Sequence, residues 1–97
     1  MSFVQIIEYE TDRADEIDAK MRQSMEQATN MPTFTHLTQT QDHDRPNHYL
    51  TIVEFPSYEA AMQNSNSPET DAMARELTAL CTSGPNYYNL DVKLSMP

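Results

Sequence analysis

Two polar side chains of this 97-residue chain are candidates for chemistry. His36 alternates with Phe34 and Thr38 in an otherwise apolar or small run, and a histidine near a pocket is suited to act as a general base near neutral pH. Asn64 lies in a polar stretch between two helical patterns, where its amide could hold a substrate carbonyl or stabilise an enolate. Both also have structural interpretations, His36 as a hydrogen-bonded strand residue and Asn64 as a cap or turn residue.

Aromatic and flexible apolar side chains supply the walls that a small ligand needs. Tyrosine rings give apolar surfaces with a hydroxyl at the tip, and methionines adapt to irregular shapes. Ordinary core packing uses the same residue types, so both roles stay open. We predict substrate contacts for five of these residues: Tyr49, Tyr58, Met62, Met73 and Tyr88.

The three histidines do not predict a metal site. His36 and His48 fall on neighbouring predicted strands, where about 3.3 Å per residue places them roughly 13–16 Å apart. His43 stands between Asp42 and Asp44 in a predicted turn, and this arrangement would bind a cation only loosely. We therefore predict no resident metal ion.

Composition limits the partners and the location of the protein. Fifteen acidic and six basic residues give a formal net charge of −9, which repels the phosphate backbone of nucleic acids and anionic membrane surfaces. No apolar run reaches the about 18 residues that a membrane span needs. The single cysteine, Cys81, cannot form an internal disulfide, which suits a reducing compartment. These features predict one acidic cytoplasmic domain over residues 1–97 without a nucleic-acid or membrane partner.

Hydrophobic periodicity predicts the order strand, helix, strand, strand, helix, strand. The strands are expected at 3–9, 33–41, 48–55 and 87–94. The first helix carries an apolar stripe from Ala14 to Ala28 and ends at Asn30 and Pro32. The second begins after Ser57, and its polar stretch at 63–67 predicts a break, followed by a second cap and a proline in the next first turn.

Several predicted strands carry apolar residues on both faces. Val4 and Ile6 point one way, while Phe3, Ile7 and Tyr9 point the other. Two helices cover only one face of a small sheet, and large exposed apolar patches are rare on monomers. The second face is therefore predicted to pack against a second copy of the chain.

The split βαβ order is typical of the ferredoxin-like topology. The stretch at 55–70 (FPSYEAAMQNSNSPET) resembles the dimeric α+β barrel family, which includes the antibiotic-biosynthesis monooxygenases and stress-responsive α/β barrels. The resemblance implies an α+β, βαββαβ fold with a four-stranded antiparallel sheet and two helices on one face. It also implies a homodimeric barrel, with a pocket between sheet and helices in each subunit and no organic cofactor.

The resemblance also bears on the candidate residues. Some cofactor-free oxygenases of the family use an asparagine in the second helix, which Asn64 matches, together with a tryptophan that this chain lacks. Haem-degrading members place a tryptophan near Asn64 and a histidine near Ala74, so the resemblance implies no haem role.

Two functions from different classes follow from these observations. One is a cofactor-independent enzyme, monooxygenase-like or a cyclase/isomerase, acting on an aromatic or polyketide-like molecule that Asn64 and His36 orient and polarise. The alternative is a non-catalytic homodimeric module that binds a small molecule or is associated with the stress response. The sequence leaves open whether the protein is an enzyme.

Overall fold

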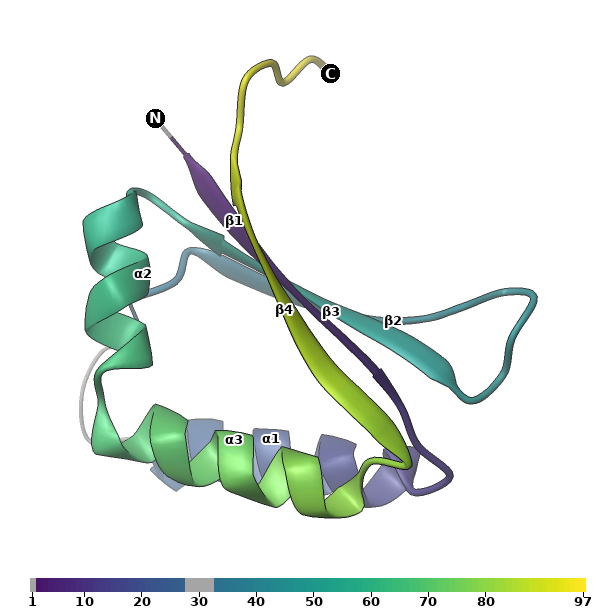
Figure 1. The fold of residues 1–97 in the computed structure, drawn as a ribbon. Coiled ribbons are helices and arrows are strands. Elements are labelled where there is room, and N and C mark those ends of the chain that lie inside the picture. The colour runs from purple at the N-terminus through teal and green to yellow at the C-terminus, as the bar shows by residue number, and fades with distance from the viewer. Residues whose placement is uncertain (1, 28–32) are drawn as a thin grey trace.

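The computed structural model describes residues 2–27 and 33–97, which form a four-stranded antiparallel sheet with three helices on one face (Figure 1). The strand order is β2-β3-β1-β4, and all three neighbouring pairs are antiparallel. The elements are β1 (Phe3–Glu10), α1 (Ala14–Gln27), β2 (His36–Gln41), β3 (His48–Phe55), α2 (Tyr58–Ser65), α3 (Pro68–Leu80) and β4 (Ser83–Asp91). This arrangement confirms the predicted α+β, ferredoxin-like fold.

The predicted break in the second helix is present and separates α2 from α3. Ser57 caps α2, where its side chain accepts a hydrogen bond from the amide of Ala60 at 3.1 Å. Ser67 caps α3 in the same way through Thr70, and Pro68 occupies the first helical turn. Two separate caps explain why the helices run in different directions in Figure 1.

The helix-covered face of the sheet holds two apolar clusters. One lies under α2 and the other between the sheet, α1 and α3, and Ile7 of β1 contacts both. Their buried members are Phe3, Val53, Phe55 and Ala61 in the first cluster and Tyr9, Ile17 and Leu77 in the second. The sheet residues in these clusters all alternate with residues that point away from the helices.

Thr11 links the two long helices at one end of the sheet. Its side chain is buried, accepts a hydrogen bond from the amide of Arg13 at 2.9 Å and donates one to the carbonyl of Leu80 at 2.6 Å. The start of α1 is thereby tied to the end of α3, and the two helices also pack against each other.

The last strand differs from its prediction at both ends. It begins at Ser83 instead of 87, because Gly84, at φ +85°, passes so close to the Glu8 carbonyl that a Cβ atom would lie 2.8 Å from it. The composition of that segment is typical of a turn, yet glycine permits the close pairing. The strand ends at Asp91 instead of 94, and the last backbone bond to the sheet runs from the Val92 amide to the Ser2 carbonyl.

Two other predicted boundaries concern the start of β2 and the end of the first helix. β2 begins at His36 instead of 33, although the Thr35 amide still donates to the Glu54 carbonyl at 2.7 Å. The predicted end of the first helix, at Asn30 and Pro32, lies outside the described residues. None of the helices in the described part of the chain is long and apolar enough to cross a membrane.

Candidate functional site

Asn64 lies in the last turn of α2, where a chain of hydroxyl groups reaches its side chain. Ser67 Oγ donates to Thr70 Oγ1 at 2.8 Å, and Thr70 Oγ1 donates to Asn64 Oδ1 at 3.4 Å. No residue in the described part of the chain accepts a hydrogen bond from Asn64 Nδ2. The side chain is half-buried, and with this one long contact on its oxygen, the amide NH₂ has no hydrogen-bond partner among the described residues.

A second polar group lies on the helix-covered face of the sheet and was not predicted. Gln39 Nε2 donates to the Tyr9 hydroxyl, Thr51 donates to Gln39 Oε1, and the Tyr9 and Thr51 oxygens lie 3.5 Å apart. Burial raises the pKa of Tyr9 above its ordinary value, so the phenol stays protonated. Because each member both donates and accepts, the three side chains close a ring of hydrogen bonds.

Three of the residues predicted to contact substrate lie in α2 or on the helix-covered face of the sheet. Tyr49 stacks on Tyr9 with ring centres 5.8 Å apart, and Met62 packs against the cluster under α2. Tyr58 meets Phe3 edge to face at 5.5 Å but is half exposed. Tyr49 and Met62 thus already use apolar surface for packing, whereas Tyr58 leaves more than half of its surface exposed.

The other predicted site residues are distributed differently. Met73 is half-buried on α3. His36 pairs directly with Glu54, whose neighbours Val53 and Phe55 point into the core, so His36 lies on the uncovered face and is exposed. Tyr88 also lies on that face, and the sheet therefore separates His36 and Tyr88 from Asn64.

We use the term open face for the sheet surface turned away from the helices. Apolar residues cross it as a diagonal, because the register places Leu50 beside Glu8, Ile52 beside Ile6, and Val4 beside Leu90. The apolar members are Val4, Ile6, Leu50, Ile52, Tyr88 and Leu90. Threonines of β2 flank the diagonal on one side and acidic residues of β1 on the other.

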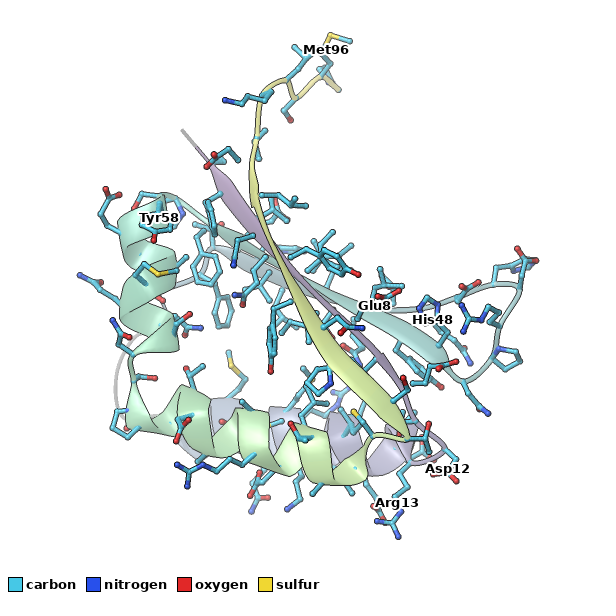
Figure 2. All side chains as sticks on the ribbon, viewed as in Figure 1. Glu8, Asp12, Arg13, His48, Tyr58 and Met96 are labelled. Atoms are coloured by element: carbon cyan, nitrogen blue, oxygen red, sulfur yellow. The ribbon has the colours of Figure 1, made fainter. Side chains whose placement is uncertain are left out.

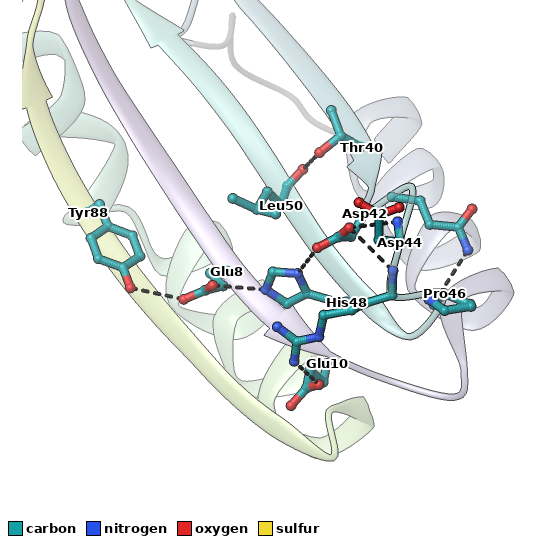
Figure 3. A network of polar contacts seen from close by, with 11 residues as sticks. Glu8, Glu10, Thr40, Asp42, Asp44, Pro46, His48, Leu50 and Tyr88 are labelled. Carbon is teal, nitrogen blue, oxygen red and sulfur yellow. Dashed lines mark hydrogen bonds and ion pairs between the residues drawn. The ribbon is translucent and has the colours of Figure 1, made fainter.

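One corner of the open face carries a network of charged side chains (Figure 3). His48 is only 8% exposed and is held between two carboxylates, with Nδ1 at 2.8 Å from Asp42 Oδ2 and Nε2 at 2.8 Å from Glu8 Oε2. The Tyr88 hydroxyl donates to the second oxygen of Glu8 at 2.9 Å. Arg45 pairs with Glu10 beside this network at 2.7 Å.

The charges of this network support one another. Hydrogen bonds to Asp42 and then to Glu8 raise the pKa of His48, and the bonds to His48 lower the pKa of both carboxyl groups. At a pH below this raised pKa, His48 is an imidazolium, and its two ring N–H groups can donate to the two carboxylates. The sequence analysis did not identify this network. Alternation indicates only that Glu8 and His48 face the same way, and the pairing of Asp42 with His48 depends on where the β2–β3 loop is centred.

Two cavities lie away from Asn64, and Tyr49 in the second is the one predicted substrate contact that lines either of them. One of about 140 Å³ borders the charged corner and is lined by residues that include Glu10, Arg45 and Asn86. The other, of about 400 Å³, lies at the start of α1 and is lined by residues that include Arg13 and Tyr49. Neither includes Asn64, and within residues 2–27 and 33–97 no three His, Cys, Asp or Glu side chains gather as metal ligands.

No family model and no curated protein sequence matches the chain. Among solved structures it is similar to SnoaB, a cofactor-independent oxygenase from Streptomyces nogalater, crystallised as an asparagine-to-alanine variant. The TM-score is 0.82 at 16% identity, over 99% of this chain and 97% of that one. A Nitrosomonas europaea protein proposed to be an antibiotic biosynthesis monooxygenase matches with a TM-score of 0.77 at 12% identity, over 95% and 90% of the two chains.

A third similar structure is a dimeric ferredoxin-like protein of unknown function from Jannaschia sp. CCS1. Its TM-score is 0.77 at 17% identity, and the match covers 95% of this chain and 100% of that one. The chain therefore has the ferredoxin-like fold found among antibiotic-biosynthesis-monooxygenase-like proteins, as the resemblance implied.

The charged corner predicts a pH dependence of stability. A raised histidine pKa stabilises the fold below the unfolded value of about 6.5 and ceases to do so as pH rises through the folded value. Lowered carboxyl pKa values stabilise it above about 4.5, and this is lost as pH falls through the folded values. His48→Gln should therefore cost most stability between about pH 4.5 and 6.5, as measured by urea unfolding at a series of pH values.

His43→Gln is the matched control, because His43 is an exposed histidine of the loop that leads into His48. This variant should leave the pH dependence of the free energy of unfolding unchanged. A difference between the wild type and His48→Gln that stays constant from pH 5 to pH 9 would contradict the charged pairing.

Proposed function

We propose that this chain is a homodimeric, cofactor-independent enzyme, a monooxygenase or a cyclase/isomerase, that acts on a small aromatic or polyketide-like molecule between the sheet and the helices. The observation that carries the proposal is the side-chain amide of Asn64 at the helix break, whose oxygen accepts from Thr70 at 3.4 Å and whose NH₂ has no partner among the described residues. The likeness of the whole chain to a cofactor-independent oxygenase supports it. The half-buried free thiol of Cys81 is consistent with a cytoplasmic location.

An amide donor suits chemistry that passes through an enolate or phenolate, because it stabilises negative charge on oxygen. In the oxygenase form, a methylene between aromatic rings loses a proton, and the anion is then oxidised by O₂. The carbon loses two hydrogens and gains one oxygen as a carbonyl, while the other oxygen atom leaves as water. A cyclase or isomerase would use the same stabilised anion and return the proton or form a carbon–carbon bond elsewhere.

The remaining site residues enter the proposal in two groups. Tyr49, Tyr58, Met62 and Met73 are proposed to contact the substrate from the helix-covered side. His36 and Tyr88 lie on the open face, so the role of His36 as a general base is a separate proposal from that of Asn64. A variant of each residue tests them independently.

One observation favours the non-catalytic alternative. The buried hydroxyls of Tyr9 and Thr51 are fully paired with Gln39, so neither is available to a substrate unless the ring opens. A binding module needs no such opening, since apolar contact and one amide donor suffice to hold a small ligand.

Oxygen uptake with anthrone- or quinol-type compounds tests the enzyme. Asn64→Ala should lower kcat by about 10²-fold or more, since that is the usual cost of removing one donor to an oxyanion. Thr70→Val, which removes the group that orients Asn64, should give a smaller loss. The readout is the initial rate from an oxygen electrode.

Gln63→Ala, at the exposed neighbouring position of α2, is the control and should retain the wild-type rate. The absence of uptake with every such compound would reject the oxygenase, and binding of the same compounds without turnover would favour the alternative.

The homodimer is proposed to form through the open face. Its apolar diagonal has no cover from the described residues of its own chain, and contiguous apolar surface of this kind marks interaction sites. The dimeric state of the Jannaschia protein with the same fold supports a second copy as the partner. A twofold pair would bring the two diagonals together.

Two adjacent tyrosines of β4 test this interface. Tyr87 and Tyr88 are both 46% exposed, but they lie on opposite faces of the sheet. Tyr88→Ser should weaken dimerisation by tenfold or more, a change of about 1.4 kcal/mol, and Tyr87→Ser should change it by less than about twofold. Equal effects of the two variants, measured by sedimentation velocity, would argue against the open face.

A further inference from the structure

The geometry around His48 fits only a ring that carries two protons. Nδ1 lies 2.8 Å from Asp42 Oδ2, and Nε2 lies 2.8 Å from Glu8 Oε2, which Figure 2 shows beside the ring on the sheet. A neutral imidazole has one N–H, so it can donate to only one of these carboxylates. Its other nitrogen would then direct a lone pair at an oxygen of the second carboxylate. Loss of one proton therefore breaks one of the two bonds and leaves a carboxylate without its cation.

Charged and titratable groups surround this ring from three elements of the chain. They are Glu8 and Glu10 of β1, Asp42 and Arg45 of the β2–β3 loop, and Tyr88 of β4. The hydrogen bonds to His48 lower the pKa of Glu8 and Asp42, and the bond to Glu8 raises the pKa of the Tyr88 hydroxyl. Arg45 stays charged at any of these pH values and pairs with Glu10. Near neutral pH, His48 is thus the member of the network that gains or loses a proton.

The network borders the surface that is proposed to join two copies of the chain. Glu8 lies in register beside Leu50 of the apolar diagonal, and Tyr88, another member of the diagonal, donates to it. The Glu8 side chain is 29% exposed, so a cover over the open face would remove water from its carboxylate. A carboxylate that leaves water is tolerated when a hydrogen-bonded cation accompanies it and is costly when none does.

We propose that His48 is a proton-operated switch of the homodimer: its charged form neutralises carboxylates at the border of the interface, and its neutral form leaves one of them uncompensated and opposes association. The switch rests on the proposed homodimer and adds a regulation that the apolar diagonal alone does not give, because burial of apolar surface involves no proton. The charge of the whole chain acts in the same direction. The formal net charge of −9 counts the histidines as neutral, so a proton on His48 reduces the repulsion between two copies.

The sign of the effect follows from the linkage between proton binding and association. The dimer binds the His48 proton more tightly than the monomer does, so association takes up protons. The dissociation constant is therefore lowest below the pKa of His48 and rises as pH rises through it. Because each copy contributes one such histidine, the logarithm of the constant rises by up to about two per pH unit in this range.

Sedimentation velocity between pH 6 and pH 9 tests the switch. The wild-type dissociation constant should rise by at least about tenfold over this range. His48→Gln cannot carry a charge, so its dimer should be weaker at pH 6, and its constant should change by less than about twofold over the range. His36→Gln is the matched control, because His36 is an exposed histidine of the same open face, and this variant should keep the wild-type pH dependence.

A second measurement uses the wild-type protein alone and does not depend on the folding of a variant. Linkage is reciprocal, so the pKa of His48, followed by the NMR signals of its ring, should be higher in the dimer than in protein diluted below the dissociation constant. An equal pKa at both concentrations, or a wild-type dissociation constant that does not change with pH, would overturn the switch and leave the homodimer standing.

Two other results have different consequences. Wild-type protein that stays monomeric at every pH would overturn both the switch and the homodimer. A pH dependence that persists in His48→Gln and disappears in His36→Gln would overturn His48 as the switching residue.

Discussion

The sheet of this protein has two apolar faces and helices over only one of them. Every sheet residue in the buried clusters points toward α1, α2 or α3, and the alternate residues form the diagonal on the open face. Each square ångström of apolar surface that leaves water contributes about 25 cal/mol, so the diagonal favours a cover. In the proposed homodimer, a second chain would provide that cover without any change to the fold.

The sheet also divides the polar chemistry of the molecule into two parts. Asn64 and the ring of Tyr9, Thr51 and Gln39 belong to the helix side. His48, with its two carboxylate partners, belongs to the open side. The first part suits the stabilisation of a substrate anion in the proposed reaction. The second places fixed charge at the border of the apolar diagonal, which in the proposed dimer would help a second copy to find one orientation.

Much of the fold was predictable because its signals are local. Pro56 ends β3 where the alternation stops, and Ser57 caps the helix that follows. The helix break lies where Ser67 and Pro68 predict the start of a new helix. The ends of β4 were not predictable from the sequence. One end depends on the close approach of Gly84 to β1, and the other depends on the residue at which the backbone pairing with β1 stops. The position of Asn64 at the helix break could be predicted from the sequence. The placement of His36 on the opposite side of the sheet from Asn64, and the His48 network, depend on the strand register, which the sequence does not give.

The most direct test of the account is the mass of the wild-type protein in solution over a wide range of concentration. Sedimentation equilibrium should give twice the 11.1 kDa of the chain at micromolar concentration, with dissociation only on strong dilution. A mass of one chain at high concentration would contradict the account, because the apolar diagonal would then be stable in water without a cover.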